Sequence, residues 1–484
     1  MRGKEFCPPQ MSRVSNQSGP RLASILVGLL WCVAILSVVV VGVLHRSRID
    51  LQIAKNYGDR IQAHYLALAG IERAKALIFQ DARDRKRSAK NHTGDLYDAP
   101  TLFRDVPLGR GKFQVFRQGR RDESAKIIYG VSDEESRLNL NHAAAEDLAK
   151  LYRMTPEVIA ALFDWRDRDN AVTPGGAETE YYSSLRPPSL PRNGPLQTTR
   201  EMLMVSGVSR ELFLGEDANE NGLLDPEEND GAASYPPDNR DGILDAGWSE
   251  FLTVDSQVHN ENAAGQDRIN VQSADESSLS SVPGISPDLA KAIVAYRNQN
   301  QIESLADLLD VAQISPQNQQ QAPSILNLGE PTQIVPQTAP GVPAPGRSGS
   351  QTVGPKLISE QLLMDIGDDV TTIAGRVQPG AININTASAE VLACLPGVDE
   401  RLAQAIVSYR KSAGFLPNIA WLLKVDGMSR EIFKQVAPKV TARSETYRIL
   451  SEGIVSSSGA RKRIQMIVRL DAGSFDTLSY REDL

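Results

Sequence analysis

The first feature of the chain is an uninterrupted hydrophobic run over residues 22–44, LASILVGLLWCVAILSVVVVGVL, which contains no charged residue. At about 1.5 Å per residue, a helix of this length spans the roughly 30 Å hydrocarbon core of a membrane. The apolar region of a cleaved secretory signal normally runs for only about 7–15 residues. The pattern therefore predicts a retained membrane anchor. Basic residues balance on its two sides, and Asp50 and Asp59 after the span favour a cytoplasmic N-terminus.

Beyond the anchor, over residues 45–80, hydrophobic side chains recur every three or four positions, which is the period of one helix face. The stripe consists of Ile49, Ile53, Tyr57, Ile61, Tyr65, Leu68, Ile71 and Ala74. No proline interrupts residues 21–98, so we expect one long helix that begins in the membrane and becomes amphipathic outside it. Such a stripe either packs on the helix's own domain or forms an interface with other subunits.

At both ends of the chain the period changes to the alternation of β-strands. The segments GKFQVFRQGRR and AKIIYGVSDEE, within residues 81–135, predict an antiparallel hairpin. Residues 445–484 likewise contain a strand, a Ser/Gly turn and a second strand. We expect these strands to share one sheet against the long helix, which gives an α+β fold and makes everything between them an insertion.

The insertion contains one helical segment three times. The copies are NLNHAAAEDLAKLYRMTPEVIAALFDWRD, NVQSADESSLSSVPGISPDLAKAIVAYRN and NINTASAEVLACLPGVDERLAQAIVSYRK, which open at Asn139, Asn270 and Asn383. Each copy ends on an aromatic residue followed by Arg166, Arg297 or Arg410. A second helical pair follows each copy: MLMVSGVSRELF, LLDVAQISPQNQ and LLKVDGMSREIF. The short strands IIYGV, FLTV and VTTI are expected to lead into the three units.

The expected units cover residues 136–215, 251–312 and 357–444. A Pro-, Gln- and Gly-rich linker, residues 313–356, is expected to separate the second unit from the third.

The segments VPGISPDLAKAI and LPGVDERLAQAI carry the helix-hairpin-helix signature, with tight turns at Gly284 and Gly397. Backbone N–H groups at such a turn can hold a phosphate, so the signature admits a DNA reader. Here carboxylates that repel phosphate follow the turns, among them Asp399 and Glu400, and Arg153 stands where the first copy should have glycine. Together with a net charge of −8, this favours a scaffold and no nucleic-acid partner.

A calcium-binding segment is expected over residues 216–250, between the first two units. Its first part, EDANENGLLDPEEN, matches the twelve-residue calcium loop in ligand type and spacing. Its candidate ligands are Asp217, Asn219, Asn221, Leu223 through its carbonyl, Asp225 and Glu228. Gly222 supplies the sharp bend. No Met-rich apolar groove flanks the loop as in calcium sensors, so we expect calcium to act as a structural staple.

A second segment, DNRDGILDAGW, repeats the pattern only in part. Asp238, Asn239, Asp241 and Asp245 form either a weaker calcium site or an Asx-rich turn.

No catalytic constellation stands out, so we expect no enzyme. The five histidines show no metal-ligand spacing and the three cysteines are scattered. Asp164, Asp167 and Asp169 lie among arginines on or just after a helix, where a solvated, salt-bridged face is expected.

Three stretches together resemble one known family: SILVGLLWCVAILSVVVV at the anchor, ININTASAEVLACLPG in the third copy, and the calcium-rich segment ending in GWSEFLTV. The chain is similar to the K-type minor pseudopilins of type II secretion (general secretion pathway protein K). The resemblance implies a pilin-like long N-terminal helix packed on an antiparallel sheet, with a large inserted helical domain. That domain has three helix-hairpin-helix units here, whereas the family usually has two.

The resemblance also implies processing, place and partners. A prepilin peptidase would cut the cytoplasmic leader, residues 1–23, after Ala23, so that Ser24 becomes the first mature residue. Gly28 stands at mature position five, where most pseudopilins have Glu, which implies a place at the pseudopilus tip. The implied location is the bacterial inner membrane, with the C-terminal domain in the periplasm. The implied partners are the I- and J-type minor pseudopilins, and exported proteins are further candidates. A membrane-anchored DNA-uptake receptor is the alternative function.

Overall fold

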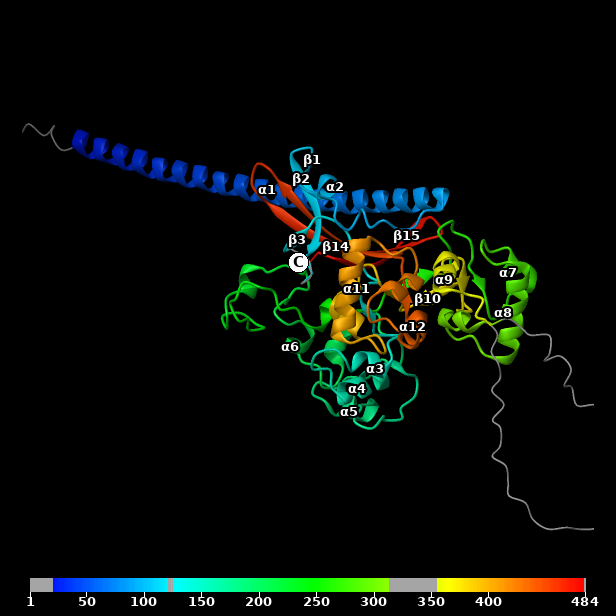
Figure 1. Cartoon of the computed structure of the whole chain (residues 1–484). Helices are drawn as coiled ribbons and strands as arrows, with labels where there is room; N and C mark the ends of the chain where they lie inside the picture. Colours follow the sequence, from blue (N-terminus) through cyan, green and yellow to red (C-terminus); the bar gives the residue numbers. More distant parts are fainter. Residues whose placement is uncertain (1–20, 121–122, 124, 313–354, 483–484) are drawn as a thin grey trace, which may run out of the picture.

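A computed structural model describes residues 21–120, 123, 125–312 and 355–482. One long helix crosses the top of the molecule in Figure 1, a sheet lies beneath its second half, and the inserted units hang below the sheet. Most of the expected leader and most of the expected linker, residues 1–20 and 313–354, lie outside the described residues.

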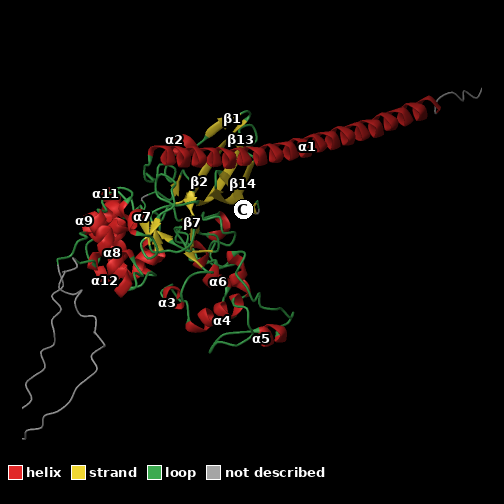
Figure 2. Ribbon diagram, turned by 90° about the vertical axis from the view of Figure 1, so that its right-hand side faces the viewer, coloured by secondary structure: helices red, strands yellow, loops and turns green. Residues whose placement is uncertain are grey.

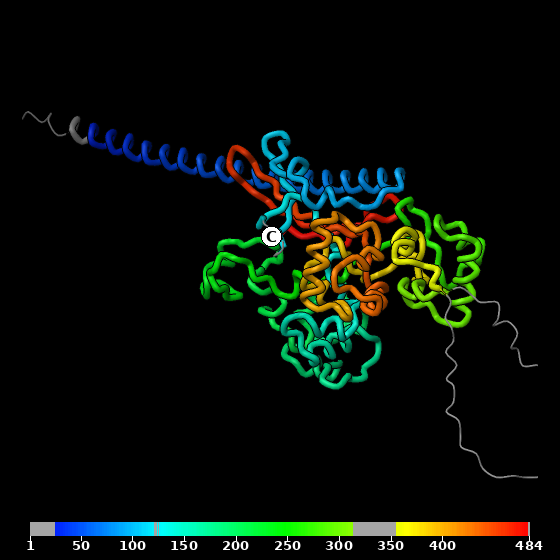
Figure 3. Tube along the Cα trace, viewed as in Figure 1, coloured from blue at the N-terminus to red at the C-terminus, as the bar shows by residue number. Residues whose placement is uncertain are grey.

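Helix α1 (Arg21–Ser88) is continuous, as predicted, and extends beyond the expected end at residue 80. Among the described residues it is the one helix long and apolar enough to cross a membrane. Its first half projects away from the rest of the molecule (Figures 1, 2 and 3). The side chains of residues 25–58 are exposed. From Ala63 onward, one face of the helix is buried against the sheet.

The sheet joins the two ends of the chain, which confirms the predicted α+β fold. The strand order is β1-β2-β13-β14-β15, all antiparallel, and β3 and β4 pair with β2 and β13. The strands are β1 (Val106–Leu108), β2 (Gly111–Gln118), β3 (Ile127–Ile128), β4 (Ser132–Asp133), β13 (Thr446–Val455), β14 (Arg461–Asp471) and β15 (Ser474–Arg481). The edge strands β1 and β15 were not predicted.

Helix α1 lies close to the sheet because small residues meet at the contact. A Cβ on Gly453 of β13 would stand 2.1 Å from the carbonyl oxygen of Ala63, so only glycine fits there. Ala67, Ile71 and Ala74 are fully buried at this contact. A short helix, α2 (Pro100–Phe103), buries Phe103 in the same core. Burying one large apolar side chain contributes roughly 1.5–3 kcal/mol. The last part of the hydrophobic stripe, which includes Ile71 and Ala74, therefore packs on the protein's own sheet.

Each inserted unit is closed by two short parallel strands, one at its start and one at its end. The pairs are β5 (Leu138–Asn139) with β6 (Leu252–Thr253), β8 (Ile269–Asn270) with β9 (Val370–Thr371), and β11 (Ile382–Asn383) with β12 (Val440–Thr441). The prediction that FLTV and VTTI lead into units was therefore wrong, because these strands end the preceding unit. Parallel strands need a long crossover, and the helices of each unit provide it.

We define unit 1 as residues 138–253, unit 2 as residues 269–371 and unit 3 as residues 382–441. The calcium-type segment was expected between units 1 and 2, but it lies inside unit 1, because β6 closes that unit only after it. Unit 1 contains α3 (Ala145–Leu148), α4 (Pro156–Arg166), α5 (Thr179–Ser184) and α6 (Arg210–Phe213), with 3-10 helices η1 (Thr199–Met204), η2 (Pro226–Glu228) and η3 (Trp248–Glu250). Unit 2 contains α7 (Glu276–Ser280), α8 (Pro287–Gln299), η4 (Leu305–Asp310) and α9 (Glu360–Ile366). Unit 3 contains α10 (Ala389–Ala393), α11 (Glu400–Ala413), η6 (Ile419–Lys424), α12 (Arg430–Val436) and η7 (Ala437–Lys439). Between units, β7 (Gln257–His259) pairs with β10 (Val377–Pro379).

The residues that repeat in the three copies hold each unit to its first strand. The side-chain oxygens of Asn139, Asn270 and Asn383 each accept a hydrogen bond from the backbone N–H two residues later, at 2.8–2.9 Å. The guanidinium groups of Arg166, Arg297 and Arg410 donate to the carbonyl of the residue after that asparagine. The repeat is therefore a set of structural hydrogen bonds rather than a row of ligand-binding groups.

The sequence led us to expect that the Pro/Gln/Gly tract separates units 2 and 3, and this prediction was wrong. The tract is inserted within unit 2, between η4 and α9, where the other units have the short turn of their second hairpin. Residues 357–371 therefore belong to unit 2, and the second helical partner is α9 rather than the segment ISPQNQ. The backbone bridge from Ala312 to Lys356 brings the two sides of the insertion together.

Units 2 and 3 pack directly on each other. The Asn418 side chain, at the start of η6, donates to the carbonyl of Met364 in α9 at 2.8 Å. In the other direction, Lys434 on α12 pairs with Asp307 on η4 at 2.6 Å. All three units contribute to one continuous hydrophobic core.

Candidate calcium loops and hairpin turns

The first calcium-type loop, residues 217–228, draws its two ends together. Each of its terminal carboxylates, on Asp217 and Glu228, accepts hydrogen bonds from two backbone N–H groups of the loop at 2.9–3.2 Å. Gly222 has φ of +69°, a left-handed conformation that suits glycine and makes the bend. The predicted positions 1, 6 and 12 therefore have the local structure that the motif requires.

Hydrogen bonds join the middle ligands of the loop. The side-chain amides of Asn219 and Asn221 both donate to Oδ2 of Asp225, at 3.0 and 2.7 Å. Their own side-chain oxygens accept from the backbone N–H groups of Asn221 and Leu223. Hydrogen bonds thus connect the predicted side-chain ligands into one group of oxygen donors, the kind that Ca²⁺ prefers.

The two terminal carboxylates are buried, with 4% of Asp217 and 4% of Glu228 exposed. Burial raises the pKa of Asp217 to about 6. Burial, together with the charges of Asp217 and Asp225, raises the pKa of Glu228 to about 7. A divalent cation at this centre would remove the cost of holding these charges together, so the residues present fit calcium.

The loop is docked on the sheet. Oδ1 of Asp225 lies 3.0 Å from the Arg463 guanidinium of β14. Although burial acts in the opposite direction, Arg463 holds the pKa of Asp225 below its usual value. Leu223 packs in a small buried cluster with Phe116 of β2 and Leu450 of β13. Order in the loop is therefore linked to the face of the sheet opposite α1.

The second segment forms a similar turn with an additional carboxylate that the sequence analysis missed. Glu216, 7% exposed, accepts from the backbone N–H groups of Asn239 and Asp245, each at 3.0 Å. This resembles the way Glu228 closes the first loop, so Glu216 takes the place of the closing glutamate, where the second segment has Trp248. Nothing in the segment's own spacing signals Glu216, because it precedes the first loop in the chain.

The other predicted ligands of the second segment are more exposed. Asp241 and Asn239 lie at the surface. Asp238 is already used by an adjacent turn, since its Oδ2 accepts from the backbone N–H groups of Asp230 and Gly231 at 2.7 Å. Both alternatives, a weaker calcium site and an Asx-rich turn, stay open.

The hairpin turns at Gly284 and Gly397 have φ of +97° and +70°, as their role in tight turns predicts. A Cβ on Gly284 would lie 3.2 Å from Ile366 of α9, so this turn faces the next hairpin rather than solvent. The backbone N–H groups that follow the turns are capped by side chains: Ser286 accepts from Leu289, at 3.2 Å. Asp399 likewise accepts from Leu402, at 2.8 Å. These two N–H groups are therefore already used by side chains of the protein itself.

The expectation of a solvated, salt-bridged face at Asp164 and Asp167 was wrong. Asp164 has no exposed surface. The neighbouring Arg166 donates to the carbonyls of Leu140 and Ala143 instead of pairing with these acids. Arg166 does not pair with the acids because it makes the hydrogen bond to the first strand's end that Arg297 and Arg410 make in the other two units.

The predicted processing residues Ala23 and Ser24 lie in the first turn of α1. Cleavage between them stays a prediction.

Comparison with known proteins gives two family models. A model described as "Type II secretion system (T2SS), protein K" matches residues 131–214, and a helix-hairpin-helix motif model matches residues 265–326 and 377–441. The two matches of the helix-hairpin-helix model cover much of unit 2 and all of unit 3.

Curated relatives fall into two groups. Type II secretion system protein K of Klebsiella pneumoniae is 30% identical over 172 residues, which cover 32% of this chain and 48% of that protein. Endonuclease/exonuclease/phosphatase family domain-containing protein 1 of Mus musculus is 25% identical over 177 residues, covering 37% of this chain and 28% of that protein. The chain thus matches about half, or less, of the length of these relatives.

A solved structure described as the GspK-GspI-GspJ complex from enterotoxigenic Escherichia coli also matches. Its TM-score is 0.39 at 13% identity, covering 90% of this chain and 99% of that one.

The fold and its sites define a pilin-like protein: a long helix on an antiparallel sheet, with an inserted helix-hairpin-helix domain. Within that class, the protein K model and the Klebsiella relative confirm the resemblance drawn from the sequence. These findings support a K-type minor pseudopilin of the type II secretion system.

Proposed function

We propose that this chain caps the tip of the type II secretion pseudopilus, contributing to its initiation and to protein export across the outer membrane. The observation that carries the proposal is the division of α1. Its first half is apolar and unpacked, whereas its second half is buried on the sheet. A helix divided in this way joins a membrane and neighbouring helices to a rigid head. The role is structural, so no catalytic step is assigned to any residue.

The location follows from the same helix. Residues 24–44 would lie in the bacterial inner membrane, with the N-terminus in the cytoplasm and the head in the periplasm. A prepilin peptidase would remove the leader after Ala23. With Gly28 instead of Glu at mature position five, the chain would accept no subunit ahead of it.

The proposed partners are the I- and J-type minor pseudopilins. Ile53 is 61% exposed and Tyr57 68%, although both continue the stripe whose later members are buried. Exposed apolar side chains outside the membrane favour association with other helices. Exported proteins that meet the head are a further proposed partner.

The test places one negative charge on either side of this part of α1. Ile53→Asp should abolish co-purification with the I- and J-type subunits and strongly reduce protein export in a host lacking the native gene. Lys55→Asp is the matched control, because residues two apart point about 200° apart around a helix. If Ile53→Asp exports and co-purifies as well as the control does, the stripe is not the interface.

We also propose that calcium is the cofactor, bound by the first loop and more weakly by the second. Calcium would neutralise the buried carboxylates of Asp217 and Glu228 and fix the loop on the sheet. The first loop would use the ligands predicted from its sequence. The second would use Asn239, Asp241 and Asp245, with Glu216 in the closing position.

Calorimetric titration of the full chain in detergent with calcium tests this proposal. Glu228→Gln should abolish the tighter binding event, and Glu216→Gln should affect only the weaker one. Glu227→Gln is the control, because Glu227 is adjacent and exposed. If Glu228→Gln binds calcium as tightly as the control, the first loop is only a turn.

A further inference from the structure

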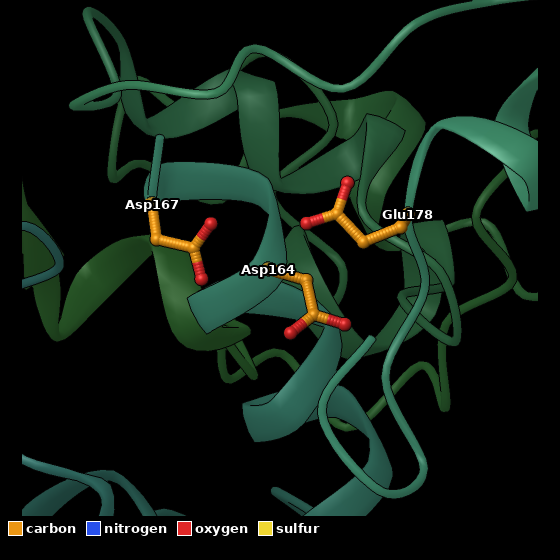
Figure 4. Close-up of side chains that lie close together, drawn as sticks. All are labelled: Asp164, Asp167 and Glu178. Atoms are coloured by element: carbon orange, nitrogen blue, oxygen red, sulfur yellow. The ribbon is translucent and has the colours of Figure 1, made fainter. Parts of the chain in front are cut away.

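Three carboxylates of unit 1 meet at a place that neither calcium loop includes. Asp164 lies in the last turn of α4, Asp167 follows that helix, and Glu178 precedes α5. One carboxylate oxygen from each lies within 4.8 Å of the others. Figure 4 shows Asp167 and Glu178 approaching a shared space from opposite sides, with Asp164 between them.

Asp164 and Glu178 are buried and Asp167 is half-buried, and two carboxylate oxygens of the cluster have no hydrogen-bond partner among the described residues. Asp164 is 0% exposed and accepts from the Thr173 backbone N–H at 3.1 Å. Glu178 is 2% exposed, and its Oε2 accepts from the Thr179 backbone N–H at 3.1 Å. Its other oxygen, Oε1, is buried without a partner among the described residues, as is Oδ1 of Asp167. An unpartnered buried carboxylate oxygen is costly, so these atoms point to a missing ligand.

No basic side chain among the described residues forms an ion pair with this cluster. Two arginines flank Asp167. Arg166 hydrogen-bonds to backbone carbonyls and stacks 3.9 Å from the centre of the Phe163 ring, and Arg168 is exposed at the surface. The C-terminal end of α4 adds a further unfavourable effect, because the helix dipole there disfavours negative charge. Burial and the neighbouring carboxylates raise the pKa of Asp167 and Glu178.

The backbone is shaped to bring these groups together. A Cβ on Gly176 would stand 2.1 Å from Oδ2 of Asp164, so only glycine allows the loop to pass this close to the carboxylate. Gly175, with φ of +86°, makes the turn that returns the chain to Glu178. The loop of residues 167–178 therefore folds back onto the end of α4.

We propose that Asp164, Asp167 and Glu178 bind a hard divalent cation, calcium or magnesium, at a site separate from the loops at 217–228 and 238–245. Carboxylate oxygens are the ligands that both cations prefer, and solvent water would complete the coordination. The cation neutralises the buried charges and ties the loop of residues 167–178 to α4. The site rests on residues of unit 1 alone, so it does not depend on the proposed secretion function.

Hydrogen exchange resolved along the sequence tests the site in the unaltered protein. The full chain in detergent is stripped with EDTA and then given calcium or magnesium chloride in separate experiments. We expect at least tenfold slower exchange of amides in residues 167–180 with one of the two cations, which also identifies the ion. No slowing with either cation at millimolar concentration would overturn the proposal.

Substitutions then assign the effect to the cluster. Glu178→Gln should lose the protection of residues 167–180 and reduce bound metal by one equivalent, while residues 217–228 respond as before. Glu180→Gln, an exposed change two residues away, should behave like the unaltered protein. If Glu178→Gln keeps both the slowed exchange of residues 167–180 and the same number of bound metal ions, the proposed site is contradicted. If Glu178→Gln fails to fold, the measurement on the unaltered protein decides alone.

Discussion

Glu134 and Arg448 form a bidentate ion pair that joins the start of the insertion to the sheet. Oε2 and Oε1 of Glu134 lie 3.0 and 2.7 Å from Nε and Nη2 of Arg448 on β13. Glu134 has no exposed surface, and it also accepts from the hydroxyl of Thr253, in the strand that closes unit 1. One carboxylate thus holds unit 1 and the sheet together.

Glu134→Gln should lower the free energy of unfolding by about 3 kcal/mol, because it leaves Arg448 buried without its partner. Chemical unfolding of the full chain in detergent measures the loss. The double variant with Arg448→Met should lose less than the sum of the two single variants, and simple additivity would contradict a direct pair. Burial acts to raise the pKa of Glu134, but Arg448 and Arg137 hold it below its usual value. The pair's contribution is therefore present above the unfolded pKa of about 4.3 and is lost as pH falls through the folded value.

His92 should make the protein less stable in mild acid. Its ring packs against both Tyr97 and Phe415, with centroids 5.5 and 5.8 Å away, and those two rings are themselves 6.0 Å apart. Burial, with Arg85 and Arg443 nearby, lowers its pKa to about 3. The unfolded chain takes up a proton near pH 6.5 and the folded chain does not, so stability falls as pH drops below that value. Between pH 7.5 and 5.5 the loss is about 1 kcal/mol. In His92→Phe, the loss of unfolding free energy between pH 7.5 and 5.5, measured by thermal melts, should be smaller by that amount. The same loss in the variant and in the unaltered protein would exclude His92 as the cause.

Arg153→Gly should stabilise unit 1. Arg153 has φ of +59°, at the place where units 2 and 3 have glycine. An exposed arginine in this left-handed conformation costs up to about 1 kcal/mol relative to glycine. Gly397→Ala should have the opposite effect, and its Cβ would come no closer than 3.4 Å to Ile432, so strain rather than a clash would be measured. Thermal melts that move in the same direction for both variants would contradict this reasoning.

Arg297→Met should destabilise unit 2 by about 2 kcal/mol, because hydrogen bonds from a charged group to carbonyls are among the stronger ones. Arg297 donates to the carbonyls of Val271 and Ala274 and so ties the end of α8 to β8. Lys291→Met, an exposed change on the same helix, is the matched control. Equal unfolding midpoints for the two variants would show that the repeated arginine has no structural role.

Patterns of local origin could be read from the sequence. The period of three to four residues predicts α1, and alternation predicts the strands around Phe113 and Ile449. The left-handed turns at Gly222, Gly284 and Gly397 follow from the conformational freedom of glycine.

Relationships between distant segments could not be read in this way. Nothing in the sequences FLTV and VTTI indicates which strand each one pairs with. Only the fold shows that each pairs with the first strand of the preceding unit. The sequence does not show that the Pro/Gln/Gly tract lies within unit 2, because α9, the helix that completes the unit, follows only after residue 354. Glu216 and Glu178 likewise reach their neighbours only after the chain has turned back.

The sequence by itself determined the apolar run at the start, the long helix, the strands at both ends, the three repeats and the first calcium-type loop. These features depend on neighbouring residues, whose spacing and chemistry are fixed along the chain. The tertiary structure alone decided which strands pair, where each unit ends, and which acids become buried together. Those outcomes depend on burial and on contacts across long stretches of chain, and Asp164 shows the difference: its sequence context predicts a solvated acid, and only packing removes it from water.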